Sequence, residues 1–398
     1  MRIIIFGVML AISISCSEQK DNSNTITMPP VSEGSGESSL VTTDQGLILS
    51  WIEKIEGVAQ LKMSTYDGKD WSTPTTIAQG DDWFVNWADF PAIVANGDAL
   101  FIHFLQKSAA STYAYDVMYS VSQDLGRVWS TPEKLHQDTV AAEHGFVSAV
   151  PYKDGFYVSW LDGRNTVVDN GFMSVRGAFM STDGIMSKSA EIDGGVCDCC
   201  QTSMAIVNDV PWSFYRDRSD EEIRDIYAAK LIDDTWTDPQ EINNDNWLIK
   251  GCPVNGPRAM TYNNTLAVSW FTGVDGINNV MLKISDDGGE TFAEVIIVDG
   301  PTSLGRVDIQ MDANKIYLSY LTKNDNKTTL NLKIYSHEGE LSNSEVITTV
   351  NPSRGTGFPR TALWHDNLVF TWTDIDNKSV KVFSYPLEKN KLQARTGK

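Results

Sequence analysis

The chain has 398 residues, 10% of them aromatic and 21% charged, and a formal net charge of −20 at neutral pH. Nucleic-acid phosphates would repel so acidic a chain, so we expect no nucleic-acid partner. Beyond the N-terminal apolar run, no stretch is long enough to cross a bilayer as a helix. These features favour a soluble, exported surface protein.

The N-terminus is typical of an export signal. Residues 1–15 carry one positive charge, Arg2, followed by an apolar run too short to span a bilayer. Small residues before Cys16 resemble a bacterial lipoprotein cleavage site, with Ser13 in place of the usual leucine. We expect Cys16 to be lipidated, residues 16–38 to form a tether, and the membrane to be reached through this anchor only. The expected location is the cell envelope, at the outer membrane or cell surface, with the periplasm as the alternative. The simpler alternative to lipidation is an ordinary secretory signal in which Cys16 has no role.

The rest of the chain contains a repeat. Seven short segments, rich in β-branched and aromatic residues, resemble buried strands, and most follow a tight turn. The copies recur every 50 to 56 residues, and a repeat of roughly this length with four strands indicates a propeller blade. We therefore predict an all-β fold, a single monomeric β-propeller over residues 39–386 with a tail at 387–398, and seven four-stranded blades, six being the alternative. The aromatic anchors, spaced 50 to 56 residues apart, are Trp51, Phe104, Trp160, Phe214, Trp270, Tyr320 and Trp372.

The seventh blade has three clear strands, from about Pro359 to Tyr385. Its fourth strand is missing at the C-terminal end. We expect residues 25–28, ahead of the first blade, to supply it, because pairing the two ends of the chain removes the free sheet edges.

Two turns between third and fourth strands carry a sharper signature. Residues 122–129 and 285–292 follow the pattern Ser-x-Asp-x-Gly-x-x-Trp/Phe, with weaker copies at 64–71 and 181–184. This pattern resembles the Asp-box of the sialidase (BNR-repeat) superfamily. The resemblance implies a propeller, with the active site on the opposite edge from these turns.

Arginines gather in the loops that lead into the first strands and in those between second and third strands, which share one face of a propeller. Because an arginine offers a bidentate fork, such a face suits a carboxylate or sulfate. The alternative is that residues 216–218 and 221–225 pair with one another as a solvated network. The candidate substrate-binding residues are Arg164, Arg216, Arg218, Arg258, Arg306, Arg360 and Trp87.

Sialidases hold the sugar carboxylate with three arginines and use a tyrosine activated by a glutamate, with an aspartate as acid–base group. By this resemblance, Arg258, Arg306 and Arg360 are a conceivable triad. The family's early arginine has no counterpart, because Arg127 is the first arginine after Arg2, and no Tyr–Glu pair is assignable.

Three further residues are candidate catalytic acid–base groups: Asp89, Glu143 and His144. His144 is equally interpretable as a hydrogen-bonded structural residue.

Four cysteines remain after Cys16. Cys197, Cys199 and Cys200 form a Cys-x-Cys-Cys run, and Cys252 leads into the next blade. An even number in an exported protein favours two disulfides, with cross-loop pairing to Cys252. The alternatives are a Cu(I) or Zn(II) thiolate cluster and a redox-active pair.

Taken together, the sequence predicts a sialidase-like propeller that acts on or binds acidic glycans through an arginine-rich central face. If it is an enzyme, it is a glycoside hydrolase or a polysaccharide lyase, with no cofactor required. The alternatives are a non-catalytic glycan- or protein-binding surface lipoprotein and a metal or redox protein centred on the cysteines, since a propeller alone does not define activity.

Overall fold

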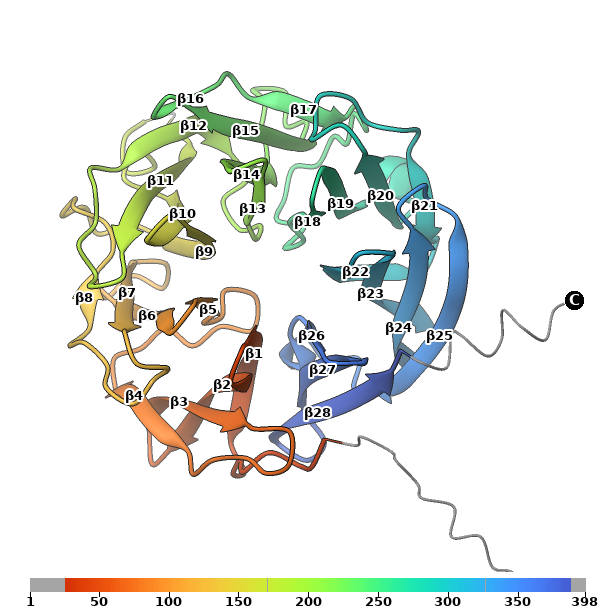
Figure 1. Ribbon diagram of the computed structural model, residues 1–398. Coiled ribbons are helices and arrows are strands. Elements are labelled where there is room, and N and C mark those ends of the chain that lie inside the picture. The colour runs from red at the N-terminus through yellow and green to blue at the C-terminus, as the bar shows by residue number, and fades with distance from the viewer. Residues whose placement is uncertain (1–25, 170, 326, 388–398) are drawn as a thin grey trace, which may run out of the picture.

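The computed structural model describes residues 26–387 except 170 and 326, so the predicted signal peptide and Cys16 lie outside the described residues. Within them, seven antiparallel sheets stand around a central axis, and successive sheets follow one another around the ring (Figure 1). The prediction of an all-β, seven-bladed propeller is confirmed. None of the described helices is long and apolar enough to span a bilayer.

Consecutive strands pair in each sheet, except that the last strand of the fourth sheet pairs with the third, and the first strands lie nearest the axis (Figure 1). The strands of the first three blades are β1 (Ser35–Thr43), β2 (Gly46–Ile55), β3 (Val58–Tyr66) and β4 (Thr75–Gly80); β5 (Ile93–Asn96), β6 (Ala99–Lys107), β7 (Tyr115–Ser122) and β8 (Glu133–Lys134); and β9 (His144–Tyr152), β10 (Gly155–Asp162), β11 (Met173–Ser181) and β12 (Ala190–Val196).

The other four blades follow in chain order, and the fourth carries one additional short strand. Their elements are β13 (Ser203–Val207), β14 (Val210–Arg216), β15 (Ile226–Ile232), β16 (Thr235–Trp236) and β17 (Gln240–Asn243); β18 (Arg258–Tyr262), β19 (Thr265–Thr272), η1 (Val274–Gly276), β20 (Asn279–Ser285) and β21 (Ile296–Asp299); β22 (Ser303–Met311), β23 (Lys315–Asn324), β24 (Lys327–Ser336) and β25 (Leu341–Val350); and η2 (Arg354–Thr356), β26 (Arg360–Trp364), β27 (Asn367–Asp374) and β28 (Ser379–Pro386).

The second strand of each blade forms the core. Every residue of β10 is buried, because neighbouring blades cover both faces of the sheet. A strand covered on both sides has a continuous apolar run in place of alternation. The predicted aromatic anchors all lie on these second strands, and Trp51, Trp160 and Trp270 are fully buried.

The two full Asp-box turns have the predicted geometry. The Ser122 hydroxyl binds the carboxylate of Asp124, which also accepts a hydrogen bond from the amide of Val128. Asp287 repeats the arrangement, and the hydroxyl and amide of Thr291 lower its pKa to about 2. The turns are therefore hydrogen-bonded structural elements.

The ring closes differently from our expectation. The seventh sheet contains only β26, β27 and β28 within the described residues, and residues 26–28 form no strand, so the predicted fourth strand is wrong. Two prolines follow at once, and a proline cannot donate to a sheet ladder. Closure comes from the start of β1, where the amide of Gly34 binds the carbonyl of Lys378 at 2.7 Å and the hydroxyls of Ser38 and Thr371 lie 2.8 Å apart.

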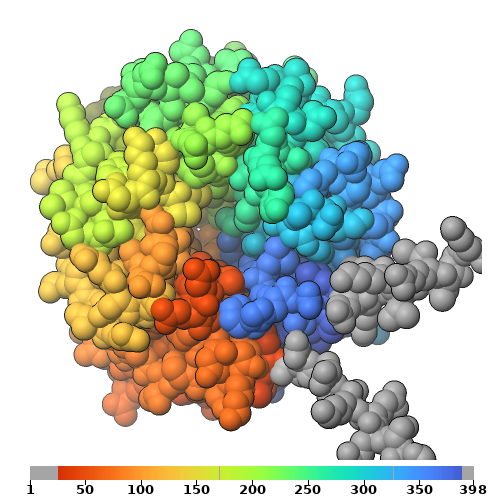
Figure 2. All heavy atoms as spheres, viewed as in Figure 1, coloured from red at the N-terminus to blue at the C-terminus, as the bar shows by residue number. Residues whose placement is uncertain are grey.

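The first strands of the blades surround an axial channel of about 490 Å³. The space-filling view shows the blades packed side by side around a narrow central opening (Figure 2). One end of this channel is where the loops leading into the first strands meet.

Candidate functional site

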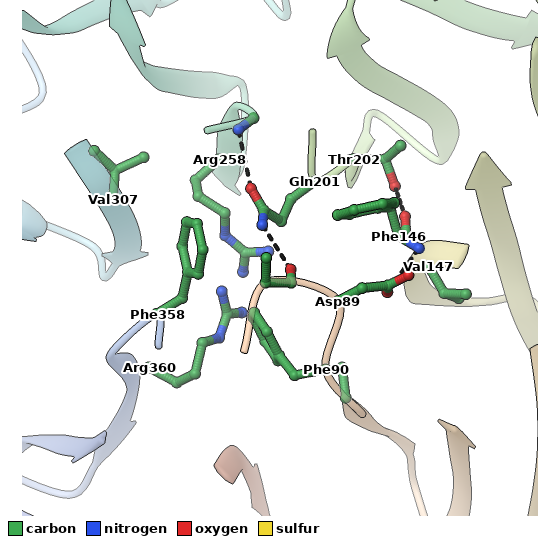
Figure 3. A pocket seen from close by; sticks show the side chains of 13 residues that line it. Asp89, Phe90, Phe146, Val147, Gln201, Thr202, Arg258, Val307, Phe358 and Arg360 are labelled. Carbon is green, nitrogen blue, oxygen red and sulfur yellow. Dashed lines mark hydrogen bonds between the residues drawn. The ribbon is translucent and has the colours of Figure 1, made fainter. Parts of the chain in front are cut away.

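A small pocket of about 40 Å³ lies at that end of the channel (Figure 3). Its lining comes from loops and first strands of several blades, so residues far apart in sequence meet at the axis. Arg258 and Arg360 line both the pocket and the channel. The other pocket residues with chemical interest are Asp89, Phe90, Phe146, Gln201, Thr202 and Phe358.

Two arginines share one carboxylate in this pocket. Arg258, at the start of β18, and Arg360, at the start of β26, lie 3.0 and 3.1 Å from the same Oδ1 atom of buried Asp308. The other carboxylate oxygen accepts from the amide and hydroxyl of Thr361, both at 2.7 Å. Two guanidinium groups against one carboxylate leave an excess positive charge facing the pocket.

A third arginine lies next to the pocket wall. The Arg306 guanidinium is 4.9 Å from the ring centroid of Trp87 and 5.9 Å from that of Phe358, and it donates to the carbonyl of Gly357. Burial, aided by Arg354, lowers the pKa of Arg306 to about 10. Burial and the neighbouring Arg258 lower the pKa of Arg360 to about 10 as well. Both groups remain protonated at neutral pH.

Asp89 also lines the pocket, but its carboxyl group points away from Arg258 and Arg360 and toward Phe146 (Figure 3). Burial raises its pKa to about 8, and the amide of Phe146, which donates to Oδ1 at 2.8 Å, only partly opposes this. Asp89 is therefore largely protonated at neutral pH. A Cβ on Gly145 would lie 1.9 Å from its Oδ2 atom, so glycine is required for the close approach.

Behind Asp89 lies a tyrosine that sequence reasoning missed. The hydroxyl of Tyr115, the first residue of β7, donates to Glu143 at 2.6 Å and lies 3.4 Å from Asp89. Burial raises the pKa of Glu143 to about 7, although the Tyr115 hydrogen bond lowers it. A Tyr–Glu pair is thus present, formed by residues 28 apart in sequence. The sequence contained no spacing signal for it.

His144 belongs to a separate cluster. Its imidazole stacks on that of His136, with ring centroids 3.7 Å apart, among Asp116, Asp138 and Asp162. Arg164 pairs with Asp162 at 2.6 Å and Asp138 at 3.1 Å, so this predicted ligand-binding arginine has internal partners. His136 was missed because it lies in an irregular loop after β8 without a recognisable spacing.

The two arginines of the loop between β14 and β15 also have internal partners. Arg218 pairs with Glu222 and Asp198, as the solvated-network interpretation expected. Arg216 is buried and donates to the carbonyls of Asn255, Arg224 and Phe271. In the described part of the chain no carboxylate lies within 4.0 Å of the Arg216 guanidinium.

The four cysteines come together, but one of the two predicted disulfides is present among the described residues. Cys199 and Cys252 form a disulfide across two neighbouring loops, which agrees with the predicted pairing to Cys252. Cys197 and Cys200 are buried free thiols with their sulfur atoms 3.0 Å apart, so a second disulfide is not formed in this structure. The Arg224 guanidinium lies 3.3 Å from the Cys197 sulfur.

The axial pocket can therefore hold an anion against two arginines, with a protonated carboxylic acid in its wall and a buried Tyr–Glu pair behind that acid. Such groups are those of an acid–base site. The chain belongs to the BNR repeat-like domain family, whose model matches residues 56–369. A comparison of the sequence with curated proteins finds no significant match.

Solved structures share the fold at low sequence identity. A PL25 ulvan lyase is 12% identical with a TM-score of 0.55, and the match covers 89% of this chain and 94% of that one. A GH93 α-L-arabinofuranosidase of Fusarium graminearum, solved with arabinobiose, is 12% identical with a TM-score of 0.50, covering 92% and 99%. At this identity the likeness establishes the propeller alone.

Proposed function

We propose that this protein is an exported, carbohydrate-active propeller that takes an anionic group of an acidic glycan at the axial pocket. The observation that carries the proposal is the sharing of Asp308 by Arg258 and Arg360. A buried guanidinium without its own carboxylate is costly unless a ligand supplies the missing charge. A sugar carboxylate or sulfate would supply it, and it matches the fork geometry of arginine.

The groups beside the arginines favour turnover over simple binding. Asp89 carries a proton at neutral pH and can donate it to a leaving oxygen, while Glu143 can activate the Tyr115 hydroxyl. The proposed roles are therefore Asp89 as acid and the Tyr115–Glu143 pair as nucleophile or base. The proteins of similar fold named above include a glycosidase and a lyase. This supports a carbohydrate substrate but does not distinguish hydrolysis from elimination.

The test is a digest of acidic polysaccharides and their neutral counterparts by the wild-type protein and by Arg360→Gln and Asp89→Asn. New reducing ends alone indicate hydrolysis, and an ultraviolet-absorbing unsaturated product indicates a lyase. We expect turnover of an acidic glycan only, lost in both variants. Arg127→Gln is the matched control, because Arg127 is exposed on an Asp-box turn. Binding without product in any digest would assign the pocket to a glycan-binding protein.

A second candidate rests on Arg216. This buried cation donates to three carbonyls and stacks 4.9 Å from the ring centroid of Trp247, and it helps to lower the pKa of Cys197. A thiolate would provide its counter-charge, which supports a redox or soft-metal centre at the cysteines. Thiol titration of the native protein, with elemental analysis of Cys197→Ser and Cys200→Ser, tests it. Unreactive thiols with no bound copper or zinc would exclude this centre.

A further inference from the structure

Two stacked histidines beside the axial site form the most unusual polar cluster in the described structure. His136 follows β8 and His144 begins β9, and both side chains are buried. Asp116, Asp138 and Asp162 contact the imidazoles, Arg164 pairs with two of these aspartates, and Glu143 interacts electrostatically with His144. The proposed glycan chemistry uses neither histidine.

The arrangement resembles the support of metal-bound imidazoles. His136 Nδ1 lies 2.7 Å from Asp138, which can accept its proton. Its Nε2 atom is then left with a lone pair, has no hydrogen-bond partner and lies 3.2 Å from Asp116 Oδ1. A lone pair facing a carboxylate is repulsive unless a cation lies between them. A carboxylate behind one imidazole nitrogen commonly orients the other toward a metal ion.

His144 repeats this arrangement. Its Nε2 atom faces Asp138 at 3.2 Å and Asp162 at 3.5 Å, and its Nδ1 atom lies 3.3 Å from the Ala142 carbonyl and 4.0 Å from Asp116 Oδ1. Whichever nitrogen carries the proton, the other faces a carboxylate. Nε2 makes no geometrically acceptable hydrogen bond, as for His136.

Charge and spacing select one set of ligands. Arg164 already neutralises the side with Asp138 and Asp162. On the other side, Asp116, His136 and His144 bring three ligand atoms within 4.8 Å of one another, and the described residues provide no lysine or arginine partner for Asp116. Ligand atoms held about 2.0–2.1 Å from a tetrahedral zinc ion are themselves roughly 3.3 Å apart.

We propose that Asp116, His136 and His144 bind one divalent first-row transition metal ion, with Zn²⁺ as the best match. Two imidazoles and a carboxylate suit Zn²⁺ and disfavour Ca²⁺ and Mg²⁺, which take oxygen ligands. Asp116 is 22% exposed, so solvent reaches the site and can complete the coordination. Asp138 and Asp162 act as positioning residues.

The charge of the groups in contact with the two imidazoles agrees with this assignment. Without Glu143, which is hydrogen-bonded to Tyr115, three carboxylates from Asp116, Asp138 and Asp162 against the Arg164 guanidinium leave an excess of two negative charges when both imidazoles are neutral. One divalent cation removes that excess. Two protons would also remove it, but they would place two imidazolium rings 3.7 Å apart in a parallel stack.

The test is elemental analysis of the purified chain, followed by Co²⁺ titration of the chelator-treated protein with visible absorption as the readout. We expect one metal per chain and cobalt bands typical of nitrogen and oxygen ligands. Asp116→Asn, which keeps shape and is partly exposed, should weaken Co²⁺ binding at least tenfold, and His136→Asn should abolish it. The matched controls are Asp154→Asn and His365→Asn, both at exposed positions away from the cluster.

Two results would overturn the proposal. One is a chain that binds no Co²⁺ and carries no metal while it remains folded by circular dichroism. The other is metal that persists in Asp116→Asn and His136→Asn but is lost in Cys197→Ser, which would place the metal at the thiols. Neither readout depends on glycan turnover, so the metal site and the glycan proposal can fail separately.

Discussion

Arg258 and Arg360 approach the axis from blades five and seven and bind the same oxygen of Asp308 in blade six. This contact joins three blades at the end of the channel and leaves one positive charge without a partner carboxylate. It is therefore both a structural link and the basis for recognising an anion.

Replacing the shared carboxylate of Asp308 tests the structural role. Asp308→Asn leaves two partly buried guanidinium groups uncompensated, so we expect a loss of up to about 3–5 kcal/mol in the free energy of unfolding. Urea denaturation measures it. Asp154→Asn, in an exposed hairpin turn, should stay within about 0.5 kcal/mol of wild type. Equal stability of both variants would mean that Asp308 is not the counter-ion of the arginines.

Asp89 should make stability depend on pH. Its folded pKa of about 8 lies above the unfolded value, so the unfolded state releases this proton at lower pH than the folded state. The stabilising contribution is complete below about pH 4 and declines as pH rises toward about 8. Asp89→Asn should flatten this decline, and urea denaturation across that range tests it.

The same substitution separates stability from chemistry. Because asparagine resembles the protonated acid and stays neutral in the unfolded chain, Asp89→Asn should match the wild type near pH 4 and be at least as stable at neutral pH. If Asp89 is the proton donor, turnover should fall roughly 10²–10⁴-fold. A variant that retains full turnover would remove Asp89 from the proposed chemistry.

The Tyr115 hydroxyl is tested by Tyr115→Phe. Its loss removes the hydrogen bond that holds the pKa of Glu143 down, so the pKa of Glu143 should rise above about 7. We expect turnover to be lost if the Tyr115 hydroxyl is the nucleophile, and the acid limb of the pH–rate profile to move upward if Glu143 is the base. In both cases stability should fall by about 1 kcal/mol. Tyr113→Phe, at an exposed ring two residues away, is the control. An unchanged profile would contradict a catalytic pair.

The Cys199–Cys252 disulfide should contribute to stability through the unfolded chain. It links residues 53 apart, and removal of a cross-link of that span costs about 4 kcal/mol in the chain-entropy account. Cys252→Ser should therefore lower the denaturation midpoint strongly. Mass spectrometry after alkylation of the unfolded, unreduced protein should find Cys197 and Cys200 modified and Cys199 and Cys252 protected. Modification of Cys199 or Cys252 would contradict the disulfide.

Much of the fold was predictable because each blade repeats one buried strand. Trp160 and Trp270 lie on strands covered by neighbouring blades, and such strands have apolar runs visible in the sequence. The closure was not predictable in the same way. It depends on hydroxyl and backbone contacts, such as that of Ser38 with Thr371, which leave no hydrophobic pattern.

For the candidate site, the sequence predicted which loops share a face but not which side chains contact one another. Arg258, Arg360 and Asp89 were predicted to share one face of the propeller, and the structure brings them to one pocket. Tyr115 and His136 were missed because their partners come from other loops and neighbouring strands, and a single sequence does not encode that register. Arg216 and Arg218 were assigned to the face but bind the protein itself.

The most direct measurement is calorimetric binding of one acidic oligosaccharide and its carboxyl-reduced counterpart to the wild-type protein and to Arg360→Gln. The account predicts salt-sensitive binding of the acidic sugar alone, weakened at least tenfold in the variant, with Arg127→Gln unchanged. Equal binding of the two sugars, or binding that survives in Arg360→Gln, would contradict an anion-binding centre at the axis.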